Sequence, residues 1–328
     1  MLFFVLEVFT SKTSKTKVLD GISFFSVVKL VLLHFFAGVT CMVEEILIGR
    51  KTFFIAPDFS LIPESYLEEY LELGYECYFV CNDKTLPVEY KIDVILSVFK
   101  DSIVFFCIDT VIHGVNWEKI IFRMQKKYGD KARLGVIYNK RKTDAERHAL
   151  ERRFLFDMGL QCGCIQLEYQ KRNNFALIEK VLFANQARGR RMSVRAICDG
   201  DCNYTITTKH GRITGKVNDI SMTHFSITLQ ENECDTKLYE KVCEIVLGVK
   251  GTFIRTDAVL YMSRPVKDGI LNIFMFVDKM GHQGLDSRNQ ANLLPKLYSI
   301  LHENCDNLLK KLCETTRRKL IEENKEEF

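Results

Sequence analysis

Short apolar runs alternate with amphipathic stretches between residues 46 and 187. Nearly continuous apolar runs of four to six residues are typical of strands that are covered on both faces of a parallel sheet. Six such runs are predicted as strands: Thr52–Ala56, Cys77–Cys81, Asp93–Val98, Ile103–Ile108, Leu134–Tyr138 and Cys164–Leu167.

The stretches between these runs have the spacing of helices with one apolar face. Ser65 and Asn116 are placed to cap two of them, and Thr143 and Glu146 have the spacing of a capping box. The alternation of strands and helices predicts a receiver-like, doubly wound α/β domain over residues 42–187. The predicted helices are Ser65–Leu73, Trp117–Tyr128, Asp144–Met158 and Asn174–Ala187.

The pattern changes to short alternating strands between residues 188 and 285. Turn-rich pieces such as Asp199-Gly200-Asp201 separate these strands, and their regular spacing predicts an antiparallel β-barrel. The predicted strands are Ser193–Cys198, Tyr204–Thr208, Ile213–Ile220, Phe225–Gln230, Val242–Val249, Phe253–Met262 and Ile270–Asp278.

The remaining residues, 286–328, contain one helical stripe from Asn292 to Glu323, with Asn292 as the cap and Pro295 in the first turn. Fewer than three clean heptads are present, so we expect the helix to pack within the chain rather than form a coiled coil. The stripe consists of Leu293, Leu294, Leu297, Ile300, Leu301, Leu308, Leu312 and Cys313.

Residues 1–41 form an apolar extension, in which Ile22–Cys41 is long enough to span a bilayer but contains Lys29 and His34. Three interpretations stay open: an upstream extension before a natural start at Met42, a membrane anchor, and a signal peptide with a lipid on Cys41. We favour the first, and expect membrane contact only if residues 22–41 are a real anchor.

Composition agrees with two folded domains in 328 residues, because 47% of the residues are hydrophobic and only 27% are charged. Twelve cysteines spread over a long chain indicate a reducing compartment, so we expect a cytoplasmic protein. The net charge of +4 is too small to require a nucleic-acid partner, and none is expected.

The α/β half has neither of the glycine-rich phosphate loops, and no catalytic constellation is found in the chain. Asp58 and Asp109 follow strands, but the acidic pair of a phosphoacceptor site is missing, so both are interpreted as turn residues. We therefore predict no enzyme activity and no cofactor. The clusters Lys140-Arg141-Lys142 and Lys171-Arg172 are interpreted as solvated helix entrances.

The cysteines do not predict a metal site. Cys198 and Cys202 with His210, and Cys162 with Cys164, lack the C-x-x-C spacing of structural zinc sites. We interpret these cysteines as small core residues.

Four arginines stand within eight residues where the barrel begins: Arg188, Arg190, Arg191 and Arg195. Guanidinium groups this close repel one another unless an anion or water screens them, and their planar forks suit phosphate oxygens and the edge of guanine. Some 24 residues later, Asp219-Ile-Ser221 stands at the end of a predicted strand and places a carboxylate beside a hydroxyl.

The R-x-x-x-R of Arg191 and Arg195, followed by D-x-S at Asp219 and Ser221, resembles the PilZ domain, the cyclic di-GMP receptor family. A receiver-like half before such a barrel looks most like the two-domain spirochaetal members. The resemblance implies that Arg191 and Arg195 hold phosphates and stack on guanine, that Asp219 and Ser221 meet the guanine edge or the phosphates, and that Arg190 assists.

The family pattern has glycine three residues after the serine, where this chain has His224. The first hypothesis is a receptor in which cyclic di-GMP reorients the domains and promotes binding of an unidentified protein partner, with bacterial motility as an output that the resemblance implies. The second is a degenerate interaction module that does not bind the nucleotide, which His224 favours. A nucleic-acid binder is a third, but aromatic stacking platforms near the arginines are not evident.

Overall fold

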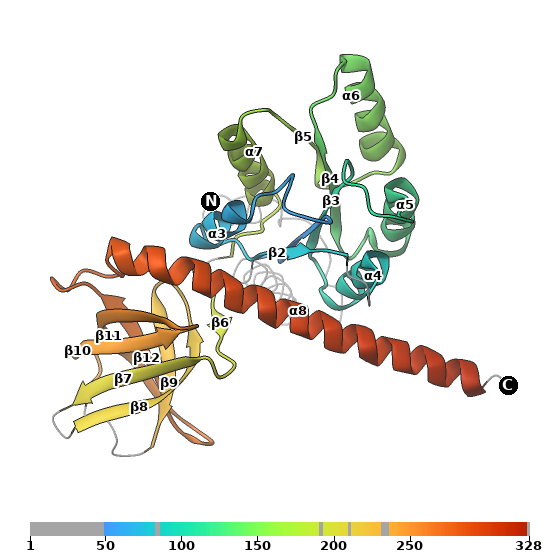
Figure 1. Ribbon diagram of the computed structural model, residues 1–328. Coiled ribbons are helices and arrows are strands. Elements are labelled where there is room, and N and C mark those ends of the chain that lie inside the picture. The colour runs from blue at the N-terminus through green and yellow to red at the C-terminus, as the bar shows by residue number, and fades with distance from the viewer. Residues whose placement is uncertain (1–48, 83–85, 190–192, 209–210, 231–235, 327–328) are drawn as a thin grey trace, which may run out of the picture. The chain divides into compact units, whose positions relative to one another are not determined.

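The N-terminal half is built on a five-stranded parallel sheet with strand order β2-β1-β3-β4-β5 (Figure 1). The computed structural model describes residues 49–82, 86–189, 193–208, 211–230 and 236–326, without the side chains of 319–326. This order is that of flavodoxin-like doubly wound sheets, as predicted. The strands are β1 (Thr52–Ile55), β2 (Cys77–Val80), β3 (Ile103–Cys107), β4 (Arg133–Asn139) and β5 (Gly163–Leu167).

Helices cover both faces of this sheet (Figure 1). On one face, the ring of Tyr70 in α3 stacks on Phe175 in α7 with 4.5 Å between centroids. On the other, Lys127 of α5 binds Asp93 of α4 at 2.8 Å. The helices are α3 (Glu64–Glu72), α4 (Val88–Val98), α5 (Trp117–Tyr128), α6 (Asp144–Glu151) with a π-helical continuation over Arg152–Asp157, and α7 (Lys171–Ala184).

The predicted strand Asp93–Val98 is wrong, because these residues form the second half of α4. Val94, Ile95 and Leu96 are consecutive and all buried. The helix is covered by the sheet on one side and by the C-terminal helix on another, where the Tyr90 hydroxyl donates to the carbonyl oxygen of Cys313 at 3.1 Å. Burial on two sides removes the helical period from the sequence.

The predicted caps are confirmed in two of three cases. The side chains of Asn116 and Thr143 accept hydrogen bonds from the third residue of their helices, and Glu146 completes the capping box. Ser65 is not a cap, because Pro63 precedes the first helical residue, Glu64. Proline is tolerated there because the first amides of a helix have no partner within the helix.

The second sheet is antiparallel, with strand order β6-β8-β7-β10-β11-β12-β9. A further pairing of β8 with β9 closes six of the strands into the predicted barrel, and β6 adds to the edge of β8. Phe225 stacks on Phe274 and Phe276 in its core. The strands are β6 (Ala196–Ile197), β7 (Cys202–Thr208), β8 (Gly211–Ile220), β9 (His224–Leu229), β10 (Lys241–Val249), β11 (Thr252–Val266) and β12 (Gly269–Val277).

The last helix, α8 (Ser287–Glu326), begins five residues earlier than predicted. Asp286 rather than Asn292 caps it, accepting from the Asn289 amide at 2.9 Å, so Pro295 lies inside the helix and not in its first turn. The apolar stripe is buried or partly buried as predicted except at Leu308, which is 43% exposed while Leu309 is buried.

Residues 47–328 form one compact unit. Within it, α8 contacts β6 and β11 of the antiparallel sheet, and it contacts β2, α3 and α4 of the α/β half. His302 Nε2 donates to the carbonyl oxygen of Phe79 in β2 at 3.1 Å. Two residues later, Asn304 Nδ2 donates to the carbonyl oxygen of Ile197 in β6 at 2.8 Å. The prediction that this helix packs within the chain is therefore confirmed.

Residues 1–41, with the three interpretations of Ile22–Cys41, lie outside the described residues. Within the described part of the chain, no helix combines the length and the apolar character that crossing a membrane requires.

Candidate functional site

Arg195 and Asp219, predicted as ligand-binding residues, lie next to each other on the barrel. Ala196 and Ile197 of β6 pair with Ile220 and Asp219 of β8, which places Arg195 at the end of that short ladder. The Arg195 guanidinium stands 4.0 Å from the Asp219 carboxylate, and 39% of the arginine side chain is exposed. The pair is loose enough to leave guanidinium donors accessible to a ligand.

The Asp219 carboxylate is oriented by a second contact. The Ser226 hydroxyl, directly opposite on β9, donates to Asp219 Oδ2 at 2.5 Å. Ser226 is 1% exposed, so the hydrogen bond is shielded from water. One carboxylate oxygen is thus held by the barrel, while the other faces Arg195.

Ser221, the third predicted site residue, shapes a turn. It is 1% exposed, and its hydroxyl accepts hydrogen bonds from the backbone amides of His224 at 3.0 Å and Thr223 at 3.3 Å. The Ser221 amide donates in turn to the carbonyl oxygen of His224 at 2.8 Å. These bonds fix the loop between β8 and β9 and thereby the side chains that it presents.

His224, at the glycine position of the family pattern, has an extended backbone at the start of β9. It is not among the residues with positive φ, so this position does not need the conformational freedom of glycine. Its Nδ1 lies 2.8 Å from the Thr223 hydroxyl. Burial, with a smaller contribution from nearby Arg195, lowers the pKa of His224 below its ordinary value of 6.5, so the ring is neutral at pH 7.

Arg195, Thr223 and His224 line a cavity of about 540 Å³, a size typical of small-molecule sites. Most of its lining residues have polar side chains, Met222 and Gly284 being the exceptions. The Ser193 hydroxyl joins the lining through a 2.8 Å contact with Thr223. The other lining residues are Glu72, Arg195, Thr223, His224, Gln283 and Gln290. Such a cavity can hold an anion with several hydrogen-bond acceptors.

Arg190 and Arg191 lie outside the described residues, so of the predicted site only Arg195, Asp219, Ser221 and His224 are placed by the structure. Sequence reasoning missed Ser193, Thr223 and Ser226, which are common polar residues without a motif.

An aromatic ring that the sequence pattern does not reveal lies beside His224. The ring of Tyr261 in β11 lies against His224, with 5.6 Å between centroids. Tyr261 follows Arg195 by 66 positions along the chain, so no local pattern connects the two residues.

The carboxyl edge of the parallel sheet also contains an aspartate and an arginine. The Arg141 guanidinium donates to both oxygens of Asp109, at 2.6 and 3.0 Å, and the Asn139 amide donates to the same carboxylate at 2.7 Å. The interpretation of Arg141 as part of a solvated helix entrance is therefore wrong. Asp109 lies in a turn as predicted, and so does Asp58, whose carboxylate accepts from the Ser60 amide at 2.9 Å. An aspartate bound in this way is not a free phosphoacceptor.

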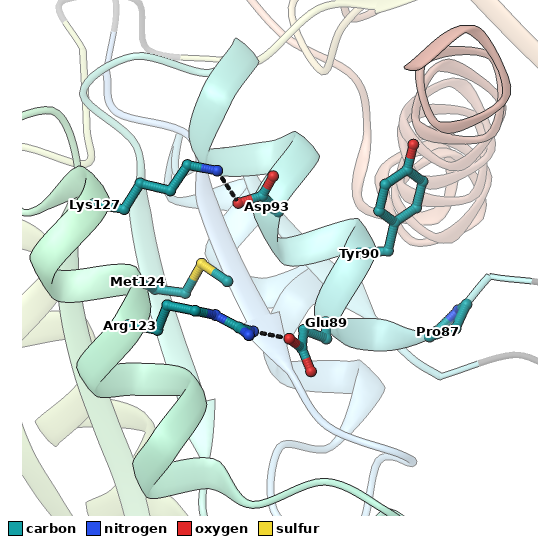
Figure 2. Close-up of a pocket in the computed structure, with 7 residues that line it drawn as sticks. All are labelled: Pro87, Glu89, Tyr90, Asp93, Arg123, Met124 and Lys127. Carbon is teal, nitrogen blue, oxygen red and sulfur yellow. Dashed lines mark hydrogen bonds and ion pairs between the residues drawn. The ribbon is translucent and has the colours of Figure 1, made fainter. Parts of the chain in front are cut away.

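A further pocket of about 420 Å³ lies beside α4 and α5, and Figure 2 shows its lining. Its four charged side chains form two ion pairs, Glu89 with Arg123 and Asp93 with Lys127. The Asp93 hydrogen bond raises the pKa of Lys127. Tyr90 points away from these pairs toward α8. We interpret this pocket as a helix junction, because its charges neutralise each other.

Cys198 and Cys202 lie in contact across the turn before β7, and their hydrogen bond is the main cause of a raised pKa at Cys198. His210 lies outside the described residues. Among the residues that the structure does describe, no group of three or more histidine, cysteine or acidic side chains could hold a metal ion.

No family model and no curated protein matches the chain. Among solved structures, Escherichia coli YcgR in complex with c-di-GMP is similar over 38% of this chain and 51% of that one, with 13% identity and a TM-score of 0.31. The PilZ domain of YcgR with c-di-GMP matches over 36% of this chain and 97% of that one, with 14% identity and a TM-score of 0.30. The Bacillus subtilis inhibitor of motility MotI matches over 33% and 49%, with 17% identity and a TM-score of 0.27. The chain spans about half the length of the first of these proteins. The identities and TM-scores of the three matches do not assign the chain to a family.

Proposed function

We propose that this protein is a non-enzymatic cyclic di-GMP receptor of the PilZ type. The observation that carries the proposal is the Arg195 guanidinium, which lines a cavity of about 540 Å³ and stands 4.0 Å from the Asp219 carboxylate in a loose pair. An arginine fork and a carboxylate complement the two recognition groups of this ligand, because phosphate accepts hydrogen bonds and the guanine edge donates them.

In this proposal Arg191 and Arg195 hold the phosphates, Arg190 assists them, and Asp219 accepts hydrogen bonds from guanine. Ser221 acts by fixing the turn that carries Thr223 and His224, because its own hydroxyl is occupied within that turn.

The output is a change in the position of one half of the chain relative to the other, which alters binding of a protein partner. Two contacts of α8 support this route. Asn304 binds the carbonyl oxygen of Ile197, two residues after Arg195, and His302 binds β2 of the parallel sheet. A ligand that binds Arg195 acts directly on the strand that α8 contacts. It can therefore shift the relative populations of two arrangements of the halves.

The test is calorimetric titration of the full-length chain with cyclic di-GMP, with GTP as a second ligand. We expect Arg195→Ala and Arg191→Ala each to weaken binding by at least roughly 30-fold, because each removes a charge that pairs with phosphate. Arg212→Ala is the matched control, since Arg212 lies at the opposite end of β8 from Asp219. Affinities within twofold of the unmodified chain for both site variants would refute the proposed site.

One observation favours the second candidate function, a module that binds a protein partner without nucleotide. The His224 side chain lines the cavity at the position where the family pattern has glycine. If this ring blocks the ligand, the unmodified chain does not bind cyclic di-GMP and His224→Gly binds it. Binding by the unmodified chain excludes this alternative.

A further inference from the structure

An aromatic ledge made of His224, Tyr261 and Tyr239 lies on the outside of the barrel. The rings of His224 and Tyr261 meet edge to face at 5.6 Å, and those of Tyr261 and Tyr239 at 6.4 Å. Tyr261 is 48% exposed and Tyr239 is 73% exposed. Exposed aromatic side chains next to a cavity have the chemistry of a stacking site for flat rings.

Both tyrosines are presented by irregular backbone. Tyr261 is the extra residue of a β-bulge, because Leu260 pairs with Phe274 and Met262 with Ile273. Tyr239 has a φ of 65°, which is unfavourable for a bulky residue, and its amide donates to the carbonyl oxygen of Leu260 at 2.7 Å. Bulges re-aim side chains next to functional sites, and backbone strain is concentrated there.

The ledge adjoins the cavity that Arg195 lines through one residue. His224 lines that cavity together with Arg195, and its ring is also the one that meets Tyr261. A ligand whose phosphate binds Arg195 therefore has an aromatic surface within reach on the same face of the barrel. Nucleotides carry a phosphate and a purine on one small molecule, which matches this arrangement.

We propose that the aromatic ledge is a purine-stacking subsite, in which Tyr261 contacts the face of one guanine while Arg195 holds a phosphate. This inference rests on the proposed receptor function and adds a contact outside the arginine and aspartate-serine motifs. His224 then contributes to binding through its contact with the ring of Tyr261. Stacking on tyrosine uses the ring face and not the hydroxyl.

The test compares Tyr261→Ala, Tyr261→Phe and Phe253→Ala in the full-length chain titrated with cyclic di-GMP. Phe253 is the matched control, because it is a 68% exposed aromatic residue near the other end of the same strand. We expect Tyr261→Ala to weaken binding roughly 5- to 100-fold, the effect of losing one base-aromatic stack. The affinities of Tyr261→Phe and Phe253→Ala should stay within twofold of that of the unmodified chain.

A second readout distinguishes stacking from an indirect effect. A cyclic dinucleotide carrying 2-aminopurine in place of one base should lose fluorescence when it binds the unmodified chain, and retain it in Tyr261→Ala at saturation. If Arg195→Ala abolishes binding while Tyr261→Ala binds and quenches normally, the subsite is refuted and the receptor function stands. If the unmodified chain does not bind cyclic di-GMP, both proposals fail.

Discussion

The two halves of the molecule each place an arginine beside an aspartate, with opposite consequences. In the α/β half, both oxygens of Asp109 are bound by Arg141 at 2.6 and 3.0 Å. In the barrel, Arg195 stands 4.0 Å from Asp219, whose other oxygen is bound by Ser226. The first pair uses up the donors and acceptors that a ligand would need, whereas the second leaves them accessible. The same two residue types therefore form a structural clamp in one half and a candidate anion site in the other.

The largest effect that separates the two pairs is on stability. We expect Arg141→Ala to lower the free energy of unfolding by about 1.5–3 kcal/mol, because it leaves the part-buried Asp109 carboxylate without its charged partner. The affinity of the Arg141→Ala variant for cyclic di-GMP should stay within twofold of that of the unmodified chain. Chemical denaturation followed by circular dichroism measures the first quantity and calorimetry the second. A binding defect in Arg141→Ala as large as that of Arg195→Ala would remove the distinction between clamp and site.

A smaller effect concerns ligand selectivity at Asp219. Asparagine has the same shape and can still accept from Ser226, but it accepts hydrogen bonds from guanine less strongly than a carboxylate does. We expect Asp219→Asn to reduce the preference for cyclic di-GMP over cyclic di-AMP by roughly tenfold. The measurement is the ratio of the two dissociation constants in both proteins. An unchanged ratio would show that Asp219 does not meet the guanine edge.

The smallest effect is a pH dependence from His224. Its pKa in the folded chain lies below 6.5, so the unfolded chain takes up this proton first as the pH falls. The stability that the neutral ring confers is thus present above pH 6.5 and is lost on acidification toward the lowered pKa.

A bound polyanion reverses the preference of His224 for its neutral form, because negative charge nearby favours the protonated ring. We therefore expect affinity for cyclic di-GMP to rise roughly threefold between neutral pH and the acid side of this window, by partial uptake of one proton. His224→Phe should abolish that rise. A slope that persists in His224→Phe would assign it to another group.

Much of the fold could be predicted because most elements face one environment. The barrel strands alternate between core and surface, as in Tyr204, Thr205, Ile206 and Thr207, and this period survives in the sequence. Residues 94–96 are consecutive and all buried, in a helix that also contacts α8, and their burial conceals the helical period. The start of α8 was missed because Pro295 is typical of a first turn, whereas here it lies inside the helix.

Only part of the candidate site could be predicted, because some of its contacts depend on distant parts of the fold. Motif spacing indicated Arg195 and Asp219, and the pairing of β6 with β8 brings them together. The buried position of Ser221 and the approach of Tyr261 to His224 depend on a turn and on a bulge two strands away. The Asp109–Arg141 pair could have been anticipated, because both residues follow neighbouring parallel strands at the same edge.

The most direct test of the central claim is hydrogen exchange of the full-length chain with and without saturating cyclic di-GMP. We predict slower exchange of the amides in residues 193–197 and 221–226, which surround Arg195 and Asp219. The amides in residues 107–111 and 139–142, around the Asp109–Arg141 clamp, should exchange at the same rate in both states. Protection of the clamp without protection of the barrel face would contradict the assignment of the ligand site to the barrel.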